Sequence, residues 1–530
     1  GLWLVAVVAV ALIGCDVIEC RGDHQNPHPV IPDNVKIQKN SRIEDMEYWY
    51  EEAAEELAES LARVENNNVA RNVVLFLGDG MSITTVTAAR IYKGQQAGDT
   101  GEEYKLAWEH FPNLGLIKTY TVDKQVADSS SSATAYLCGA KTNYYTVGVD
   151  ATAALEDCAS VTDRNKLPSV ARWALEAGKR TGFVTSTRVG HATPANLYAH
   201  SASRSWECDA DFDNETLIAC PDVKDISRQL VEDYPGRDFN VIMGGGMQYL
   251  TGNVTDRPGD PVIDEDWACI REDGRDLFID WQDHQAEEGR RFASVQSRSE
   301  LQALNLTDVD YLMGVYANGH VPYEHEKREL GLDIPTLAEM TEAAITVLSQ
   351  EANGFFLLVE GGRIDLAHHD NLFNTALDET SAFDDALIKA LEMLDTEETL
   401  IIVTADHSHV TAMNGYPLRG QDITGLADVA DDGRPFTTLS YTNGPGFYGA
   451  YEVSENGSEV VRRDITEDDV SGFGYTHNAA IGIDFDTHSG EDVPVYAIGP
   501  MSHLFQRTHE QSYIAHVISY ASCMGPNAPH

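Results

Sequence analysis

The chain has 530 residues, of which 42% are apolar, and this is enough to bury a large hydrophobic core. It carries 37 Lys and Arg against 85 Asp and Glu, which gives a formal net charge of −48. Charge of this sign repels polyanions, so general binding to nucleic acids or to anionic membrane surfaces is not expected.

The first apolar run, GLWLVAVVAVALIGC, is short for a membrane span and resembles the core of a signal peptide. Residues 1–20 therefore predict export, although Leu12-Ile13-Gly14-Cys15 leaves a bacterial lipoprotein signal open. Export permits disulfides among the eight cysteines, which are too scattered for a Cys-x-x-Cys zinc site. It also permits glycans on four Asn-x-Ser/Thr sites, at Asn214, Asn253, Asn305 and Asn456.

Residues 41–68 carry apolar side chains at helical spacing, which predicts one amphipathic helix ahead of the main domain. Residues 69–523 alternate short apolar runs with helical segments and show no internal repeat. This pattern predicts an α/β fold with a large, mainly parallel central sheet covered by helices on both faces. Within it, residues 412–475 are rich in Gly, Pro and Asp and contain short alternating strands, which predicts a small β-rich insertion.

Side chains that can bind metal ions follow several of the apolar runs. They are Asp79, His191, Thr193, Glu360, Asp365, His369, Asp406, His407 and His409. Ligands of open α/β sheets bind beyond the carboxyl ends of the strands, so we expect these segments to converge on one site. Asp365 and His369 are four residues apart and would share a helical face, whereas His368 would point elsewhere and be structural.

Mixed Asp, His and Ser ligands suit zinc, and an Asp, Glu and Thr oxygen set suits magnesium. Bound cations would also let a strongly acidic protein hold an anionic substrate.

The segment VADSSSSATAYLCG, residues 126–139, places Asp128 and Ser129 ahead of a predicted helix. Ser129 would face the positive end of the helix dipole, a favourable place for a phosphorylated oxygen. Residues 130–132 are predicted to be small packing residues, and a flexible serine linker is disfavoured by the ordered-looking flanks. A serine hydroxyl needs a base or a metal ion to react, and the absence of a Gly-x-Ser-x-Gly elbow disfavours an esterase triad.

Together, the motifs NVVLFLGDGMS, DSSSSATAYLCGAKTN, GHATPANLYAH, FFLLVEGGRID, VTADHSHV, GYPLRG and DTHSGEDVPVYAIGP resemble the animal alkaline phosphatases, from about residue 45 to 523. The resemblance implies that residues 69–523 form a catalytic domain that hydrolyses phosphate monoesters, with inorganic phosphate as product and inhibitor. It implies that Ser129 becomes a phosphoserine and that Arg204 clamps the phosphate oxygens.

The resemblance also implies two Zn²⁺ and one Mg²⁺ per subunit. One zinc ion would be held by Asp365, His369 and His488. The second would be surrounded by Asp79, Ser129, Asp406 and His407. Magnesium would be held by Asp79, Thr193 and Glu360, while Asp128, His191 and His409 would support these ligands. Vertebrate members bind calcium partly through a Phe-Glu pair, but this chain has Tyr316-Ala317 there, so a calcium site is not expected.

A homodimer is implied as well, with the β-rich insertion forming a crown at the interface and the N-terminal helix embracing the partner. Tyr416 would reach toward the partner's active site, and Cys158 and Cys220 would form a disulfide. The protein would be secreted, or held on the extracellular face of the plasma membrane by a lipid anchor. Two alternatives stay open: a phosphodiesterase or sulfatase of the same fold, and a non-enzymatic, secreted, metal-binding scaffold with an adhesive Arg21-Gly22-Asp23.

Overall fold

The computed structural model describes residues 36–38, 43–264, 268–454, 457 and 459–528. The signal-peptide-like segment, Arg21-Gly22-Asp23 and Asn456 lie outside the described residues, so the predictions made for them stay predictions.

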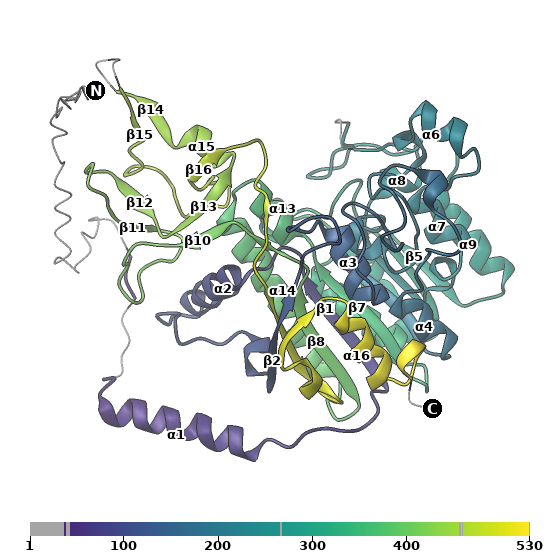
Figure 1. The fold of residues 1–530 in the computed structure, drawn as a ribbon, viewed down its shortest axis with the longest axis horizontal. Helices are drawn as coiled ribbons and strands as arrows, with labels where there is room; N and C mark the ends of the chain where they lie inside the picture. Colours follow the sequence, from purple (N-terminus) through teal and green to yellow (C-terminus); the bar gives the residue numbers. More distant parts are fainter. Residues whose placement is uncertain (1–35, 39–42, 265–267, 455–456, 458, 529–530) are drawn as a thin grey trace, which may run out of the picture.

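A ten-stranded sheet forms the centre of the molecule, in the order β19-β2-β18-β8-β1-β7-β3-β4-β6-β5 (Figure 1). Its strands are β1 (Asn72–Gly78), β2 (Asn113–Lys118), β3 (Arg180–Arg188), β4 (Val241–Gly245), β5 (Phe292–Val295), β6 (Tyr311–Val315), β7 (Phe355–Gly361), β8 (Thr399–Ala405), β18 (Val493–Ile498) and β19 (Arg507–Glu510). All neighbouring pairs are parallel except those of β18, which runs antiparallel to both β2 and β8. Every residue of β1, β7 and β8 is buried, because helices cover both faces of a parallel sheet.

Two groups of helices pack on this sheet. The first group is α2 (Ile83–Gln96), α12 (Leu337–Leu348) and α14 (Phe373–Met393), and the second is α3 (Ser129–Cys138), α4 (Val170–Glu176) and α16 (Tyr513–Ala521). Members of both groups contact β3 and β7, the helices pack within their own group, and every residue of β7 is buried, so the two groups lie on opposite faces. The predicted α/β fold with a large, mainly parallel sheet is confirmed.

Further helices lie between these elements along the chain. They are α5 (Ala192–Ala195), α6 (Asn214–Ala219), α7 (Ile226–Glu232), α8 (Met247–Leu250), α9 (Leu277–Glu287), α10 (Arg298–Ala303), α11 (Glu324–Leu330), α13 (Arg363–His369) and α15 (Gly446–Gly449).

The predicted N-terminal helix is present as α1 (Met46–Ala62), somewhat shorter than residues 41–68. Asp45 caps its first turn by accepting a hydrogen bond from the Tyr48 N–H. None of its residues is buried, and it lies along the edge of the molecule, apart from the central sheet (Figure 1).

The region predicted to be a β-rich insertion contains several small sheets, which gather at one end of the molecule (Figure 1). They are built from β10 (Thr411–Met413), β11 (Leu426–Val429), β12 (Pro435–Thr437), β13 (Leu439–Gly444), β14 (Tyr451–Val453), β15 (Val460–Arg462) and β16 (Ala479–Gly482). Strands thus begin at Thr411 and continue past 475, to Gly482. The bounds of the insertion as a unit, and its place at an interface, stay predictions.

Two disulfides close the loop-rich region that follows α3. Cys158 pairs with Cys220, as the resemblance implies, and Cys208 pairs with Cys269, which the spacing did not reveal. Asn214, Asn253 and Asn305 are exposed to solvent, and whether they carry glycans stays a prediction. Among the described residues, no helix is long and apolar enough to span a membrane.

Candidate active site and metal centre

Side chains from four neighbouring strands meet at one edge of the central sheet. β3, β7, β1 and β8 are adjacent and parallel, so their carboxyl ends lie together. The metal-competent residues at or just beyond these ends are His191, Thr193, Glu360, Asp79, Asp406 and His407. The structure therefore brings segments that are more than 300 residues apart to one place.

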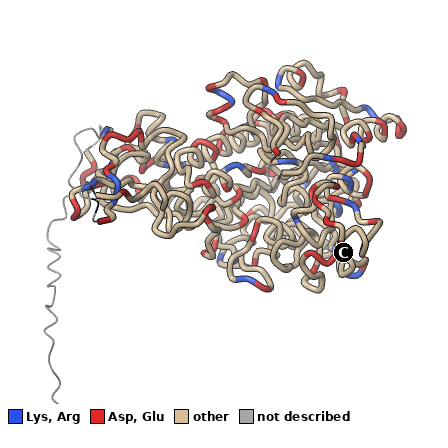
Figure 2. Tube along the Cα trace, turned by 90° about the horizontal axis from the view of Figure 1, so that it is seen from above, with Lys and Arg blue, Asp and Glu red and all other residues tan. Residues whose placement is uncertain are grey.

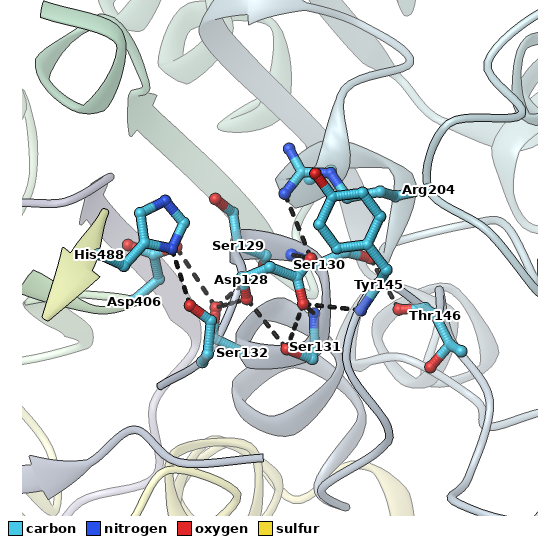
Figure 3. A network of polar contacts seen from close by, with 12 residues as sticks. Asp128, Ser129, Ser130, Ser131, Ser132, Tyr145, Thr146, Arg204, Asp406 and His488 are labelled. Atoms are coloured by element: carbon cyan, nitrogen blue, oxygen red, sulfur yellow. Dashed lines mark hydrogen bonds and ion pairs between the residues drawn. The ribbon is translucent and has the colours of Figure 1, made fainter. Parts of the chain in front are cut away.

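The serine run begins helix α3, with Ser129 as its first residue. Asp128 caps the helix, because its carboxylate accepts hydrogen bonds from the N–H groups of Ser130 and Ser131 at 3.0 and 3.3 Å. Figure 3 shows the four serines grouped around Asp128. All four are buried, which excludes a flexible linker.

Only one of these hydroxyls contacts both Asp79 and His407. Ser129 Oγ lies 3.4 Å from Asp79 Oδ1 and 3.2 Å from His407 Nε2. The other three hydroxyls donate to groups close by: Ser130 Oγ to the Thr146 carbonyl, Ser131 Oγ to Asp128, and Ser132 Oγ to the backbone of Asp128 and Ser129 and to Asp406. Ser129 thus contacts two members of the metal-competent cluster, whereas Ser132 contacts one, Asp406.

A first candidate metal site lies between helix α13 and β17 (His488–Ser489). Asp365 Oδ2 is 3.4 Å from His369 Nε2, and Asp365 Oδ1 is 3.4 Å from His488 Nε2. The opposite ring nitrogens donate to backbone carbonyls, His369 Nδ1 to Asp486 O at 2.6 Å and His488 Nδ1 to Ala127 O at 2.7 Å. Because a carbonyl only accepts, each Nδ1 carries the proton and each Nε2 keeps a lone pair for a cation.

A second candidate site surrounds His407. Its Nε2 lies 3.0 Å from Asp406 Oδ2 and 3.5 Å from Asp79 Oδ1, beside the Ser129 hydroxyl. The Asp406 carboxylate is aimed by the backbone, since its Oδ1 accepts from the Gly80 N–H at 3.0 Å. Two carboxylates, an imidazole and a hydroxyl at this spacing form a ligand set that suits zinc.

A third candidate site lies on the other side of Asp79. Asp79 Oδ2, Glu360 Oε1 and Thr193 Oγ1 are buried and have no hydrogen-bond partner among the described residues. Oxygen atoms of this kind are costly to bury unless a cation or water binds them. His191 also offers a nitrogen close to Asp79 and Glu360. The oxygen-rich set suits magnesium.

The electrostatics of the cluster also fit bound cations. Burial, together with the charges of Asp406, Asp365 and Glu360, raises the pKa of Asp79 well above its usual value. Burial raises the pKa of Glu360 to about 7, although the Thr185 hydroxyl donates to it. Carboxylates packed together without solvent are stabilised as anions only by positive charge, so these residues fit metal ions.

His409 links the first site to a residue that sequence reasoning missed. Its Nε2 lies 2.6 Å from Asp365 Oδ1 and its Nδ1 lies 2.9 Å from Asp486 Oδ2. Burial lowers the pKa of His409, but the hydrogen bonds to Asp365 and Asp486 outweigh it and raise the pKa to about 9. Asp486 thus orients His409 by its side chain and His369 by its backbone; its only sequence signal was its position two residues before His488.

Arg204 lies beside the serine helix. Its Nη1 donates to Asp128 Oδ2 at 3.2 Å, and its Nη2 lies 3.1 Å from His191 Nε2. It borders a cavity of about 700 Å³ whose lining includes Ser129, Arg204, His191, Asp365, His369 and His488. A guanidinium, the candidate nucleophile and the ligands of the first metal site thus line the same cavity.

Two further residues lie outside this arrangement. His368 is fully buried, and its ring nitrogens contact Thr85 Oγ1 at 2.9 Å and the Tyr441 hydroxyl at 2.7 Å, so it is structural, as expected. Tyr416 is 78% exposed and does not line the cavity of its own chain, so its role at a partner's active site stays a prediction.

Known proteins are similar to this chain over most of its length. A family model described as alkaline phosphatase matches residues 70–524. Alkaline phosphatase of Gadus morhua is 44% identical over 486 residues, which cover 91% of this chain and 98% of that protein. The tissue-nonspecific isozyme of Homo sapiens is 43% identical over 491 residues, covering 92% of this chain and 90% of that one. The membrane-bound alkaline phosphatase of Bombyx mori is 42% identical over 516 residues, covering 95% and 90%.

Among solved structures, that of Thermus thermophilus alkaline phosphatase aligns with a TM-score of 0.59 at 24% identity, covering 88% of this chain and 94% of that one. The Antarctic bacterium TAB5 enzyme aligns with a TM-score of 0.57 at 22% identity, covering 87% and 100%. These structures share the fold, and the animal sequences share identity over nearly the whole length. The chain belongs to the alkaline phosphatase family and is an enzyme of that family.

Proposed function

We propose that the protein hydrolyses phosphate monoesters to an alcohol and inorganic phosphate through a phosphoserine formed on Ser129. One observation carries this proposal: among the four serine hydroxyls, only that of Ser129 lies against both Asp79 and His407, in a cavity that Arg204 borders. A scaffold that merely bound metal would not need a nucleophile and an arginine clamp in the same cavity.

Three metal ions fit the ligand sets described above. We assign one Zn²⁺ to Asp365, His369 and His488, a second to Asp79, Ser129, Asp406 and His407, and one Mg²⁺ to Asp79, Thr193 and Glu360. When bound, these cations would supply positive charge that stabilises the phosphoryl oxygens and the ionised forms of the entering and leaving oxygens.

The chain itself binds and orients the phosphoryl group. Arg204 offers a planar pair of N–H donors for two phosphate oxygens, and the N-terminus of α3 adds the positive end of a helix dipole. Ser129 Oγ loses its proton and forms a bond to phosphorus as the bond to the leaving oxygen breaks, and that oxygen takes up a proton from solvent to leave as the alcohol. Water then attacks the phosphorus of phosphoserine and gives up a proton as the bond from phosphorus to Ser129 Oγ breaks. Oγ takes up a proton, which restores the serine, and inorganic phosphate is released. The product occupies the same donors as the substrate, so it should inhibit competitively.

We further propose a homodimer in which the β-rich insertion lies at the interface, α1 embraces the partner and Tyr416 approaches the partner's active site. The exposure of Tyr416 and of every residue of α1 supports this arrangement. Secretion, or attachment to the outer face of the plasma membrane by a lipid anchor, is supported by the name of the Bombyx mori relative, a membrane-bound alkaline phosphatase. Light scattering of the purified protein would give its oligomeric state.

The proposed activity can be tested by measuring the hydrolysis of three kinds of ester and the effect of a metal chelator on it. Purified protein should hydrolyse an aryl phosphate monoester much faster than the matching diester or sulfate ester. EDTA should abolish the activity, and zinc plus magnesium should restore it, because the bound cations would supply the positive charge that stabilises the phosphoryl oxygens. Preference for the diester or the sulfate would make this a same-fold phosphodiesterase or sulfatase, and metal binding without hydrolysis of any ester would make it a scaffold.

A further inference from the structure

Tyr145 holds a backbone conformation that bulky residues rarely adopt. Its φ is +67°, in the left-handed region, where a side chain crowds its own backbone. In this conformation the backbone N–H of Tyr145 donates to Asp128 Oδ1 at 2.8 Å. The Tyr145 carbonyl accepts a hydrogen bond from the backbone N–H of Arg204, also at 2.8 Å. Such strain persists only where the surrounding structure requires it, and it concentrates at functional sites.

The ring of Tyr145 supports the guanidinium of Arg204. Arg204 Cζ lies 5.2 Å from the ring centroid, within the range of a cation–π contact. The ring of Tyr144 packs against that of Tyr145 with centroids 4.7 Å apart, which limits its movement. Figure 3 shows the Tyr145 ring beside Arg204, on the side of Asp128. The guanidinium is therefore held by the aromatic ring, by Asp128 and by His191.

Glycine adopts a positive φ without strain, so the backbone alone would favour glycine at position 145. What distinguishes Tyr145 from the other non-glycine residues at positive φ is that its ring lies against a guanidinium in the cavity. We propose that Tyr145 is a positioning residue, which holds Arg204 in the orientation that binds phosphate oxygens. This inference rests on the proposed function, because it assigns to Arg204 the role of phosphate clamp.

The experiment compares Tyr145→Gly with Tyr145→Phe in zinc- and magnesium-loaded protein. Tyr145→Gly relieves the backbone and removes the ring, so the melting temperature should stay equal or rise while the Kd of inorganic phosphate, measured by calorimetry, rises about tenfold. KM for a monoester should rise by a similar factor, and more than kcat falls. Tyr145→Phe keeps the ring and should bind phosphate as the wild type does.

Two comparisons separate positioning from a general structural role. Arg507→Gly relieves another non-glycine positive φ, of +80°, on the exposed edge strand β19, and should leave phosphate affinity unchanged. In an Arg204→Ala background, Tyr145→Gly should weaken phosphate binding no further, since the ring acts through the guanidinium.

Unchanged phosphate affinity in Tyr145→Gly, or an equal loss in the Arg204→Ala background, would overturn the inference. The binding measurements decide it whether or not the wild type hydrolyses monoesters, so a failure of the proposed function would be seen separately, in the substrate assay.

Discussion

His477 shows at the scale of one residue how burial sets the response of the fold to acid. Its side chain is fully buried, and burial lowers its pKa to about 4. In the unfolded chain its pKa is about 6.5, so the folded state keeps the ring neutral over a range in which the unfolded state binds a proton. The stability that this supplies is complete above pH 6.5 and is lost as the pH falls toward 4, at up to about 1.4 kcal/mol per pH unit.

Replacing His477 with Gln should therefore make the fold less sensitive to acid. We expect the decrease in melting temperature between pH 8 and pH 5 to be smaller in His477→Gln than in the wild type, even if the variant melts lower at pH 8. His110→Gln, which changes an exposed histidine, is the control and should keep the wild-type decrease. Equal decreases in all three proteins would show that His477 does not couple folding to protons.

Among single residues, the sequence revealed those whose chemical role is indicated by the residues next to them in the chain. Ser129 could be chosen from four serines because Asp128 precedes it and a helix follows it. The hydrogen bond between His409 and Asp486 could not be predicted, because the two residues are 77 positions apart and only the fold brings them together. The same reason hid the pairing of Cys208 with Cys269, since any of the eight cysteines could have been a partner.

The turn between β1 and α2 packs directly against a residue of the metal centre. Gly80 has a φ of +67°, and a Cβ there would lie 2.6 Å from His409 Cδ2. Gly331, which ends α11, has a similar φ of +63° but open space where a Cβ would be. A side chain at Gly331 would therefore meet backbone strain alone, whereas a side chain at Gly80 would meet the same strain and also collide with His409.

Alanine at these two positions should give different results. Gly331→Ala should cost only the strain of a positive φ, about 1–2 kcal/mol, and leave kcat/KM unchanged. Gly80→Ala should carry the same strain, displace His409 and with it Asp365, and lower kcat/KM about 100-fold. Melting curves and monoester kinetics of both variants provide the check, and equal kinetics would contradict the proposed importance of this turn.

Among the elements, the buried parallel strands were the most predictable part of the fold. β1, β7 and β8 are continuous apolar runs because both of their faces are covered. The reversal of β18 could not be predicted, since a run such as VPVYAI has the same appearance in either direction. The exact pairing of the small strands of the insertion was equally hidden, because all of them except β13 have only three or four residues and so carry little periodicity.

Negative charge dominates the whole molecule. Asp and Glu occur along the backbone of the main body as well as of the insertion (Figure 2), and they outnumber Lys and Arg to give the net charge of −48. Repulsion among these charges opposes compaction, and it reaches about 30 Å at 0.01 M salt but only about 3 Å at 1 M.

Salt should therefore stabilise the protein. We expect the melting temperature to rise by a few degrees between 10 mM and 500 mM NaCl. Tetramethylammonium chloride should act similarly, because screening depends on ionic strength rather than on the identity of the cation. A melting temperature that is flat or falls with both salts would show that ion pairs, rather than repulsion, dominate the surface.

If Ser129 alone is the nucleophile, its phosphorylated form can be trapped during turnover. Zinc- and magnesium-loaded protein would be mixed with a ³²P-labelled monoester, quenched in acid, digested and mapped by mass spectrometry. We predict label on Ser129 in the wild type and in Ser130→Ala, and none in Ser129→Ala, which should also be inactive. Active enzyme that carries no label on Ser129, or label that persists in Ser129→Ala, would show that another group is the nucleophile.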